Sequence, residues 1–313
     1  MERRDHLGAL RRSRAAPRCP TLSRPSASRA SVTCFVAVRG GGHGVGGHSV
    51  CDDGLVIDLS PMKAIEVDPR RRSARAGAGL LWGELDRETQ AFGLATTGGV
   101  VTHTGIAGLT LGGGIGCLMR KHGATVDNLV SAELVTADGD VVTASADENH
   151  DLFWGIRGGG GNFGIVTSFE YRSHPVGPQV LAGPIFHSLD DAPDVLHFYR
   201  DFIAEAPDEL TTVFNLRRAP SLPLVPSEVH GRPVVMIGVC YAGPIEKGEV
   251  VLRPLRTFGS PIVDGFRASW KPFSRSLEWR SAPSFASKRP PHRLFRVKEA
   301  PFCPRSHLAN SCP

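Results

Sequence analysis

The chain has 313 residues, of which 41% are hydrophobic, and it carries a formal net charge of +5. This length suits two domains of roughly 100–200 residues each, and no apolar run reaches the ~20 residues that a membrane-spanning helix needs. The positive charge lies in residues 1–34 and 267–313, whereas residues 35–266 hold 18 basic and 27 acidic residues, so the body lacks the basic face of a nucleic-acid-binding protein.

Both ends of the chain differ from its body in composition. They are rich in Arg, Ser and Pro, hold one glycine, Gly8, against 35 in the body, and show no helical or strand periodicity. Three explanations stay open: disordered tails, translation in the wrong reading frame or, for residues 1–34, a transit peptide. The seven Cys form no C-x-x-C pair and no apolar secretory core is present, so we expect a reducing, cytoplasmic location.

The predicted elements of residues 35–175 follow from apolar periodicity and turn residues. The predicted strands are Leu55–Leu59, Ala64–Val67, Ser73–Ala76, Leu129–Thr136, Val141–Ala144 and Ile165–Tyr171. Apolar residues at helical spacing predict a helix at 80–92. A second, short helix is predicted to be capped by Ser145 or Asp147 and to end at Ile156.

Residues 176–266 are predicted to form a second domain that mixes helices with strands. Its predicted elements are an extended segment at Val180–Phe186, a helix at Asp191–Ala204, strands at Thr211–Leu216 and Val234–Tyr241, and a helix at 245–257. Helical spacing assigns Phe92 to the apolar side of the helix at 80–92 and Leu196 to the apolar side of the helix at Asp191–Ala204. The predicted fold class is α+β, and the chain has no internal repeat.

Three glycine-rich segments stand out in the body. The first, Arg39–Gly44, follows an apolar run, the second spans 105–116 and is almost uncharged, and the third spans 157–164. Glycine permits positive φ and a close approach of the backbone to a ligand, and successive amides in such a loop form a concavity that binds anions. Three such loops favour one large dinucleotide cofactor, which would carry redox chemistry.

The glycine spacing does not indicate a Rossmann domain. The pattern G-x-G-x-x-G occurs at 42–47 and at 159–164, but that fingerprint requires a strand before it and a helix after it. A turn and a strand are predicted after the first match, and a strand after the second. His43 and His48 fall short of the three or four ligands of a zinc site, so we predict no metal.

In these segments the chain resembles the FAD-linked oxidases of the berberine bridge enzyme type, within the vanillyl-alcohol oxidase and para-cresol methylhydroxylase (PCMH) superfamily. The matching stretches are VAVRGGGHGVGG (36–47), GLVIDLSPMKAIEVD (54–68), TGIAGLTLGGGIGCLMRKHGATVDNLVSAELVTADG (104–139) and NHDLFWGIRGGGGNFGIVTSFEY (149–171). The resemblance implies a PCMH-type FAD-binding domain at 35–175 and an incomplete α/β substrate domain with an antiparallel sheet at 176–266. Residues 1–34 and 267–313 do not match the family, so we expect a chain truncated or frame-disrupted at both ends.

The resemblance also implies roles for single residues. His43 matches the histidine that bonds to the flavin. The position of a second bond, through cysteine, falls at or next to Val101, so the expected cofactor is FAD with one covalent link. Ile106 matches a position that influences oxygen access. Two roles stay open for His103, a contact with the flavin and packing within the protein. The residues implied to bind the cofactor are Arg39, Gly40, Gly41, Gly42, His43, Gly44, Thr104, Gly105, Gly108, Leu111, Gly112, Gly113, Gly114, Gly164 and Ile165.

The implied activity is hydride transfer from a small hydroxylated substrate, an alcohol or a sugar, to the bound flavin, with oxygen or another acceptor reoxidising it. Relatives carry a tyrosine base in their closing segment, and none of Tyr171, Tyr199 and Tyr241 lies in that motif, so no catalytic residue is assigned. The alternative is a truncated fragment that binds flavin and turns nothing over. We expect no nucleic-acid or membrane partner, and the sequence indicates no oligomeric state.

Overall fold

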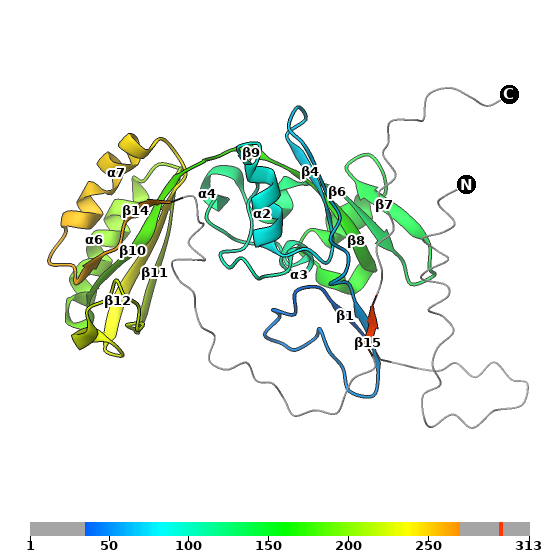
Figure 1. Ribbon diagram of the computed structural model, residues 1–313, viewed down its shortest axis with the longest axis horizontal. Helices are drawn as coiled ribbons and strands as arrows, with labels where there is room; N and C mark the ends of the chain where they lie inside the picture. The colour runs from blue at the N-terminus through cyan, green and yellow to red at the C-terminus, as the bar shows by residue number, and fades with distance from the viewer. Residues whose placement is uncertain (1–34, 270–293, 297–313) are drawn as a thin grey trace, which may run out of the picture.

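The computed structural model describes residues 35–269 and 294–296, and its first strand belongs to a small parallel sheet (Figure 1). Strand β1 (Val36–Arg39) pairs with β2 (Leu55–Asp58), and β15 (Leu294–Arg296) pairs with the other edge of β2. The sheet therefore ends at Arg39, where the first glycine segment begins.

The structure describes only a small part of the two chain ends for which the sequence analysis makes predictions. Residues 1–34 lie outside the described residues, as does most of the stretch 267–313. Within that stretch, β14 (Arg267–Ser269) and β15 are strands. The sequence shows no strand periodicity there, because pairing with distant strands organises these residues and a local pattern does not reveal such pairing.

A five-stranded antiparallel sheet forms the centre of the N-terminal body, which we define as residues 35–176. In order across the sheet, its strands are β3 (Ile65–Asp68), β4 (Ser73–Gly77), β8 (Ile165–Arg172), β6 (Leu129–Val135) and β7 (Val141–Ser145). Strand β8 holds the central place and pairs with both β4 and β6. Each of these strands forms where the sequence predicts one, with small shifts at the ends.

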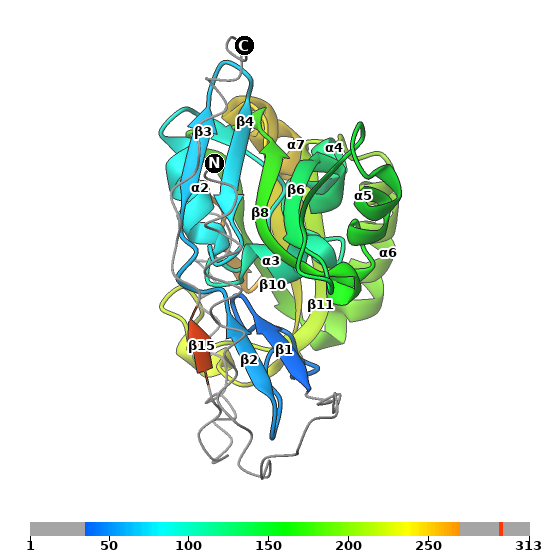
Figure 2. The same ribbon diagram turned by 90° about the vertical axis from the view of Figure 1, so that its right-hand side faces the viewer.

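Short helices pack on one face of this sheet (Figure 2). The remaining elements of the body are α2 (Trp82–Gln90), α3 (Ile106–Leu111), α4 (Met119–His122), α5 (His150–Ile156), the 3-10 helices η1 (Thr125–Asn128) and η2 (Gly160–Phe163), and the pair β5 (Leu94–Ala95) with β9 (His174–Pro175). Helix α2 buries Trp82 and Leu85 completely, with Trp82 against the ring of Tyr171. Each such side chain contributes about 1.5–3 kcal/mol by burial.

The second glycine-rich segment differs from the prediction of a loop, because residues 106–111 form helix α3. Its side facing the sheet buries Ile106 and Leu111 in the core. Thr110 Oγ1 donates to Ile106 O within the helix and lies 2.8 Å from Tyr171 Oη. Apolar contact with the sheet thus stabilises a helix despite the low helix propensity of its glycine.

Two further local predictions are wrong in detail. Helix α5 follows Asn149 in the left-handed conformation, at φ 52°. Ser145 does not cap it, because its Oγ accepts the amides of Asp147 and Glu148 in the preceding turn. The side chains of Phe92 and Leu196 are exposed at 52% and 47%, so neither faces the core; helical spacing alone does not fix where the buried stripe of a helix ends.

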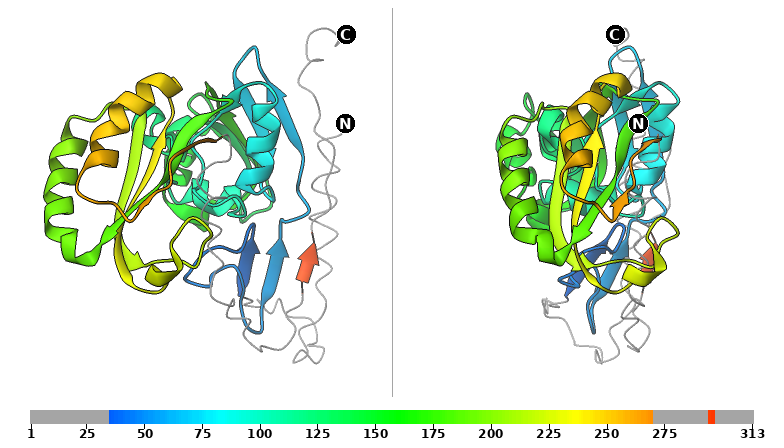
Figure 3. Two further views of the ribbon diagram at one scale, coloured as in Figure 1. Left: turned by 60° about the vertical axis from the view of Figure 1, so that its left-hand side comes forward. Right: turned by 90° about the vertical axis from the view of Figure 1, so that its left-hand side faces the viewer.

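The C-terminal body, residues 177–269, is a second antiparallel sheet with two helices on one face (Figure 3). Its elements are β10 (Val180–Ser188), η3 (Leu189–Asp191), α6 (Ala192–Ala204), β11 (Leu210–Arg218), η4 (Ser227–Val229), β12 (Pro233–Tyr241), α7 (Ile245–Thr257) and β13 (Val263–Asp264). The strand order is β11, β12, β10, β13, and β14 also pairs with β10. Helices α6 and α7 cover the face that carries Leu210 and Ile237, with Leu252 of α7 in the same buried cluster, which confirms the predicted α+β class.

Polar contacts of α4 join the two bodies. Arg120 donates from Nη2 to Ala206 O at 3.1 Å and from Nη1 to Leu210 O at 3.4 Å. Lys121 Nζ lies 3.1 Å from Glu209 Oε1. No helix within the described ranges is long and apolar enough to cross a membrane.

A histidine pair lies where the chain passes from one body to the other. The rings of His122 and His174 stack at 3.9 Å. His174 Nε2 donates to Asn128 Oδ1 at 2.7 Å, because the amide nitrogen of Asn128 itself donates to His122 O and Ala124 O. Burial, aided by the neighbouring positive groups, lowers the pKa of His174 to about 4.

This pKa predicts a pH-dependent stability. The unfolded His174 takes up a proton near its ordinary pKa of 6.5, and the folded side chain resists protonation down to about 4. Stability is therefore complete above pH 6.5 and falls as the pH drops through that window. The urea midpoint should fall from pH 7.5 to pH 5.0 in the wild type and fall less in His174→Gln. An equal fall in the variant would show that His174 is not responsible.

Candidate cofactor site

The first glycine segment exposes its backbone at the end of the small sheet. Among the described residues, no acceptor meets the amides of residues 40–44. Gly42 lies at φ +68°, a conformation that favours glycine. The Arg39 guanidinium folds back over the turn, since a Cβ on Gly42 would lie 3.4 Å from Arg39 Nε. Free amides beside a cation form an anion-binding arrangement.

The first two glycine segments touch each other through their backbones. A Cβ on Gly41 would lie 2.3 Å from Gly105 N, and a Cβ on Gly105 would lie 2.3 Å from Gly41 N. Ile106 N donates to Leu80 O, so the start of α3 is held beside α2. Only glycine permits this approach, which places the free amides of the first segment next to α3.

The third segment reaches the other end of α3 through η1. Val126 N donates to Gly113 O, and Arg157 Nε donates to Val126 O at 2.9 Å. Helix η2 contacts α3 directly. Gly164, at φ +146°, directly precedes Ile165, the first residue of β8. The three glycine segments therefore converge around one short helix, as a single large ligand requires (Figure 2).

An imidazole pair lies on the exposed side of this arrangement. The ring centroids of His43 and His103 are 4.6 Å apart, with an angle of 54° between the rings. Burial and then the neighbouring His103 lower the pKa of His43. His43 is consequently neutral at neutral pH, and a neutral imidazole has the free lone pair that bond formation to carbon needs.

The other predicted residues divide into exposed backbone and buried side chains. Gly108 and Gly112 are exposed on α3, and Thr104 is partly exposed just before it. The side chains of Leu111 and Ile106 point into the core, so they offer no surface to a ligand in this structure. The predicted residues with positive φ are Gly42, Gly113, Gly114 and Gly164.

Two tyrosines of the described chain serve packing. Tyr171 is completely buried, and burial raises its pKa far above the usual range, so it does not exchange a proton with a substrate. Tyr241 is buried in the core of the C-terminal body. These positions agree with the absence of an assigned base.

The sequence reasoning missed two polar residues on β11. Thr211 Oγ1 and Asn215 Oδ1 are buried side-chain oxygens without a hydrogen-bond partner. Both lie on the sheet face opposite α6 and α7, since Thr212 and Phe214 contact the helix side. That face is turned towards the N-terminal body (Figures 1 and 3). Strand alternation could have placed them on one face, but no local signal shows what that face meets.

The residues present fit a flavin dinucleotide. A diphosphate needs amide donors and positive charge, which residues 40–44 and Arg39 supply. Gly108 and Gly112 are exposed beside them, and His43 stands at the rim. The amides of residues 40–44 have no hydrogen-bond partner among the described residues, so they are available to a ligand.

The sequence comparisons agree with this fit. Residues 28–145 match the model of the FAD binding domain family. The chain is similar to the FAD-linked oxidoreductase pgmH of Aspergillus terreus, with 40% identity over 216 residues, covering 68% of this chain and 42% of that protein. It is also similar to (R)-6-hydroxynicotine oxidase of Paenarthrobacter nicotinovorans, with 36% identity over 231 residues, covering 73% and 48%.

Solved structures show the same fold. The crystal structure of 6-hydroxy-D-nicotine oxidase from Arthrobacter nicotinovorans matches at a TM-score of 0.70 with 33% identity, covering 79% of this chain and 54% of that one. Berberine bridge enzyme-like 1 of Physcomitrella patens matches at 0.65 with 29% identity, covering 74% and 49%. The predicted PCMH-type fold is confirmed. The chain spans about half the length of the curated relatives it matches.

Proposed function

We propose that this chain, which carries the FAD-binding domain of the FAD-linked oxidoreductases, oxidises a small hydroxylated molecule. Berberine bridge enzyme-like proteins are among its structural neighbours. The bound FAD supplies the hydride acceptor, and oxygen or another acceptor takes up the electrons. The observation that carries the proposal is the run of partnerless amides at 40–44 beside Arg39. A cytoplasmic location is part of the same proposal.

In this proposal His43 holds the flavin through one covalent bond. The neutral imidazole at the rim of the site supports this role, and no cysteine stands at Val101 for a second bond. The diphosphate rests on residues 40–44 and Arg39. The remaining proposed contacts are Thr104, Gly105, Gly108, Gly112, Gly113, Gly114, Gly164 and Ile165, and Leu111 is proposed to contribute backbone atoms alone because its side chain is buried.

The sheet of the C-terminal body supports a polar substrate. Thr211 Oγ1 and Asn215 Oδ1 are buried acceptors without partners, and Arg217 lies on the same face two residues beyond Asn215. A buried acceptor left without a donor costs about 1–3 kcal/mol. The polar residues of this sheet face favour an alcohol or a sugar over an apolar compound as the substrate.

The alternative function is flavin binding without turnover. It is compatible with the share of the relatives that the chain spans, about half of their length. The two functions differ in one measurement, the reduction of bound flavin by a substrate. Anaerobic loss of flavin absorbance on adding a substrate supports an enzyme, and an unchanged spectrum with every compound supports the alternative.

We expect the flavin to be reduced by at least one member of a panel of primary alcohols, aldoses and cyclic amines that includes (R)-6-hydroxynicotine, the compound in the printed name of one relative. For the best compound, Asn215→Leu should raise the substrate concentration for half-maximal reduction about tenfold, because it removes one hydrogen-bond acceptor. Stopped-flow absorbance near the flavin maximum measures both quantities.

Leu216→Ala provides the control on the same strand. Its side chain is 60% exposed and points to the opposite face from Asn215. The variant should bind and reduce flavin like the wild type. Equal effects of the two substitutions would show that β11 does not line the substrate site. That result would leave the proposal of flavin reduction by a substrate unaffected.

A further inference from the structure

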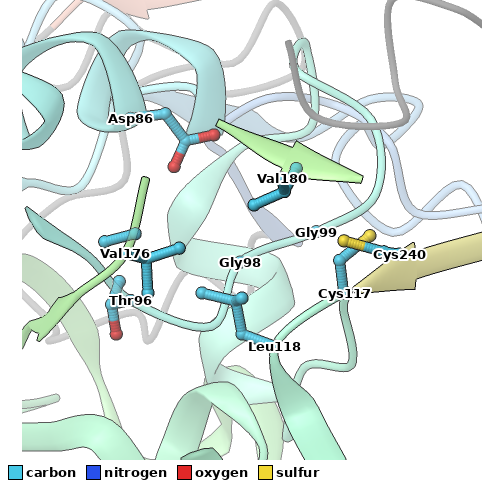
Figure 4. A pocket seen from close by; sticks show the side chains of 10 residues that line it. Asp86, Thr96, Gly98, Gly99, Cys117, Leu118, Val176, Val180 and Cys240 are labelled. Carbon is cyan, nitrogen blue, oxygen red and sulfur yellow. The ribbon is translucent and has the colours of Figure 1, made fainter. Parts of the chain in front are cut away.

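A cavity of about 60 Å³ lies where the two bodies meet (Figure 4). Helix α2 contributes Asp86, the segment after β5 contributes Thr96, and the link between the bodies contributes Val176. Its remaining wall holds two thiols, Cys117 from the end of the second glycine segment and Cys240 from β12. One cysteine thus comes from each body, at positions 123 residues apart in the chain.

The two sulfur atoms are neighbours. Figure 4 shows the side chains of Cys117 and Cys240 pointing toward each other from facing elements, and their thiols share a hydrogen bond. Both side chains also pack in one apolar cluster with Ala182 and Val180. The neighbouring residues hold them in place, because β12 is a central strand and Cys117 directly follows Gly116, which is packed against Gly98 O.

The cavity also contains groups suited to thiol chemistry. Cys117 is partly exposed whereas Cys240 is 4% exposed, so a small reagent reaches Cys117 first. The shared hydrogen bond lowers the pKa of Cys117 and raises that of Cys240, which makes Cys117 the more acidic thiol of the pair. Asp86 acts on Cys117 in the opposite sense, because its negative charge raises the pKa of the thiol, and burial raises the pKa of the Asp86 carboxyl itself to about 7.

We propose that Cys117 and Cys240 form a reversible disulfide that joins the two bodies when the protein meets hydrogen peroxide. The Cys117 thiolate attacks one peroxide oxygen, the O–O bond breaks, and the departing hydroxide takes up a proton to become water. The resulting sulfenic acid is then attacked by the sulfur of Cys240, whose proton leaves with the displaced hydroxyl as a second water. Two thiols are oxidised to one disulfide and one peroxide is reduced to two waters.

The inference does not depend on the proposed function, because the peroxide can be added. A reduced and desalted full chain, treated with hydrogen peroxide and then alkylated and digested, should give a peptide pair linking 117 to 240. Dithiothreitol should restore both free thiols. The bond closes a long loop, so the thermal midpoint of the oxidised chain should rise by about 5 °C or more.

Variants separate this pair from the other cysteines. Cys117→Ser and Cys240→Ser should each lose the linked peptide and the rise in thermal midpoint. Cys51→Ser, which removes a described cysteine far from the cavity lining, should keep both. The proposal is overturned if the oxidised wild type yields both peptides in alkylated form, a result that needs no variant, or if the midpoint rise survives in both serine variants.

Discussion

Replacing His43 with Ala should convert a protein that keeps its flavin through acid precipitation into one that releases it completely. The proposed bond between an imidazole nitrogen and the flavin would survive unfolding in the wild type, whereas every hydrogen bond to the amides of 40–44 would be lost with the fold. The absorbance of pellet and supernatant after trichloroacetic acid treatment measures the difference. The variant should still bind FAD before precipitation, because the amide cradle and Arg39 are unchanged.

His48→Ala is the matched control for this experiment. His48 lies on the same exposed loop, but the ring that contacts His43 is His103. The control should retain flavin in the pellet like the wild type. A colourless pellet from wild type and His43→Ala alike would contradict the covalent link and leave a dissociable FAD site.

Gly41→Ala should abolish flavin binding and destabilise the N-terminal body by more than about 3 kcal/mol. The new methyl group would lie 2.3 Å from Gly105 N and 2.5 Å from Gly105 Cα, and both are backbone atoms that cannot rotate away. The two glycine segments would have to separate, which displaces the start of α3 from its bond with Leu80. Urea unfolding and flavin content after purification measure the two effects.

Gly44→Ala and Gly108→Ala test whether this loss is specific. A Cβ at either position meets nothing within 4 Å, and neither residue has positive φ. Gly108 also lies inside α3, where alanine favours the helix. Both apo-proteins should unfold at or above the wild-type urea concentration. If Gly41→Ala unfolds with them, the close approach of the two segments is not required.

Strands β2 and β8 were predictable from sequence because half-buried strands alternate with a period of two, whereas β10 and β12 are buried almost throughout and were predictable as continuous apolar runs. The helix at 245–257 was predictable because its buried positions, among them Leu252 and Leu255, recur at helical spacing. Helix α3 was not, because a segment with this many glycines has low intrinsic helicity and forms only against the sheet. Its burial of Ile106 is a tertiary effect.

The glycine segments pointed to an anion site, and the structure places them together, but the partners across the fold had no local signal. The contact of His43 with His103 joins positions 60 residues apart. Two further features depend on how the C-terminal sheet packs against the N-terminal body. One is the proximity of Cys117 to Cys240, and the other is the pair of side-chain oxygens without partners, on Thr211 and Asn215. Such information lies in tertiary packing, which single-sequence patterns do not contain.

The central place of β8 has a consequence for biosynthesis. The ribosome makes β3, β4, β6 and β7 first, and those pairs remain two unconnected hairpins until Ile165–Arg172 emerges between them. The three glycine segments of the cofactor site therefore cannot assemble around α3 on a shorter nascent chain. The reason is that β8 supports α3 through the contact of Tyr171 with Thr110. Emergence of one late-made strand sets the earliest moment at which the growing polypeptide can capture its coenzyme.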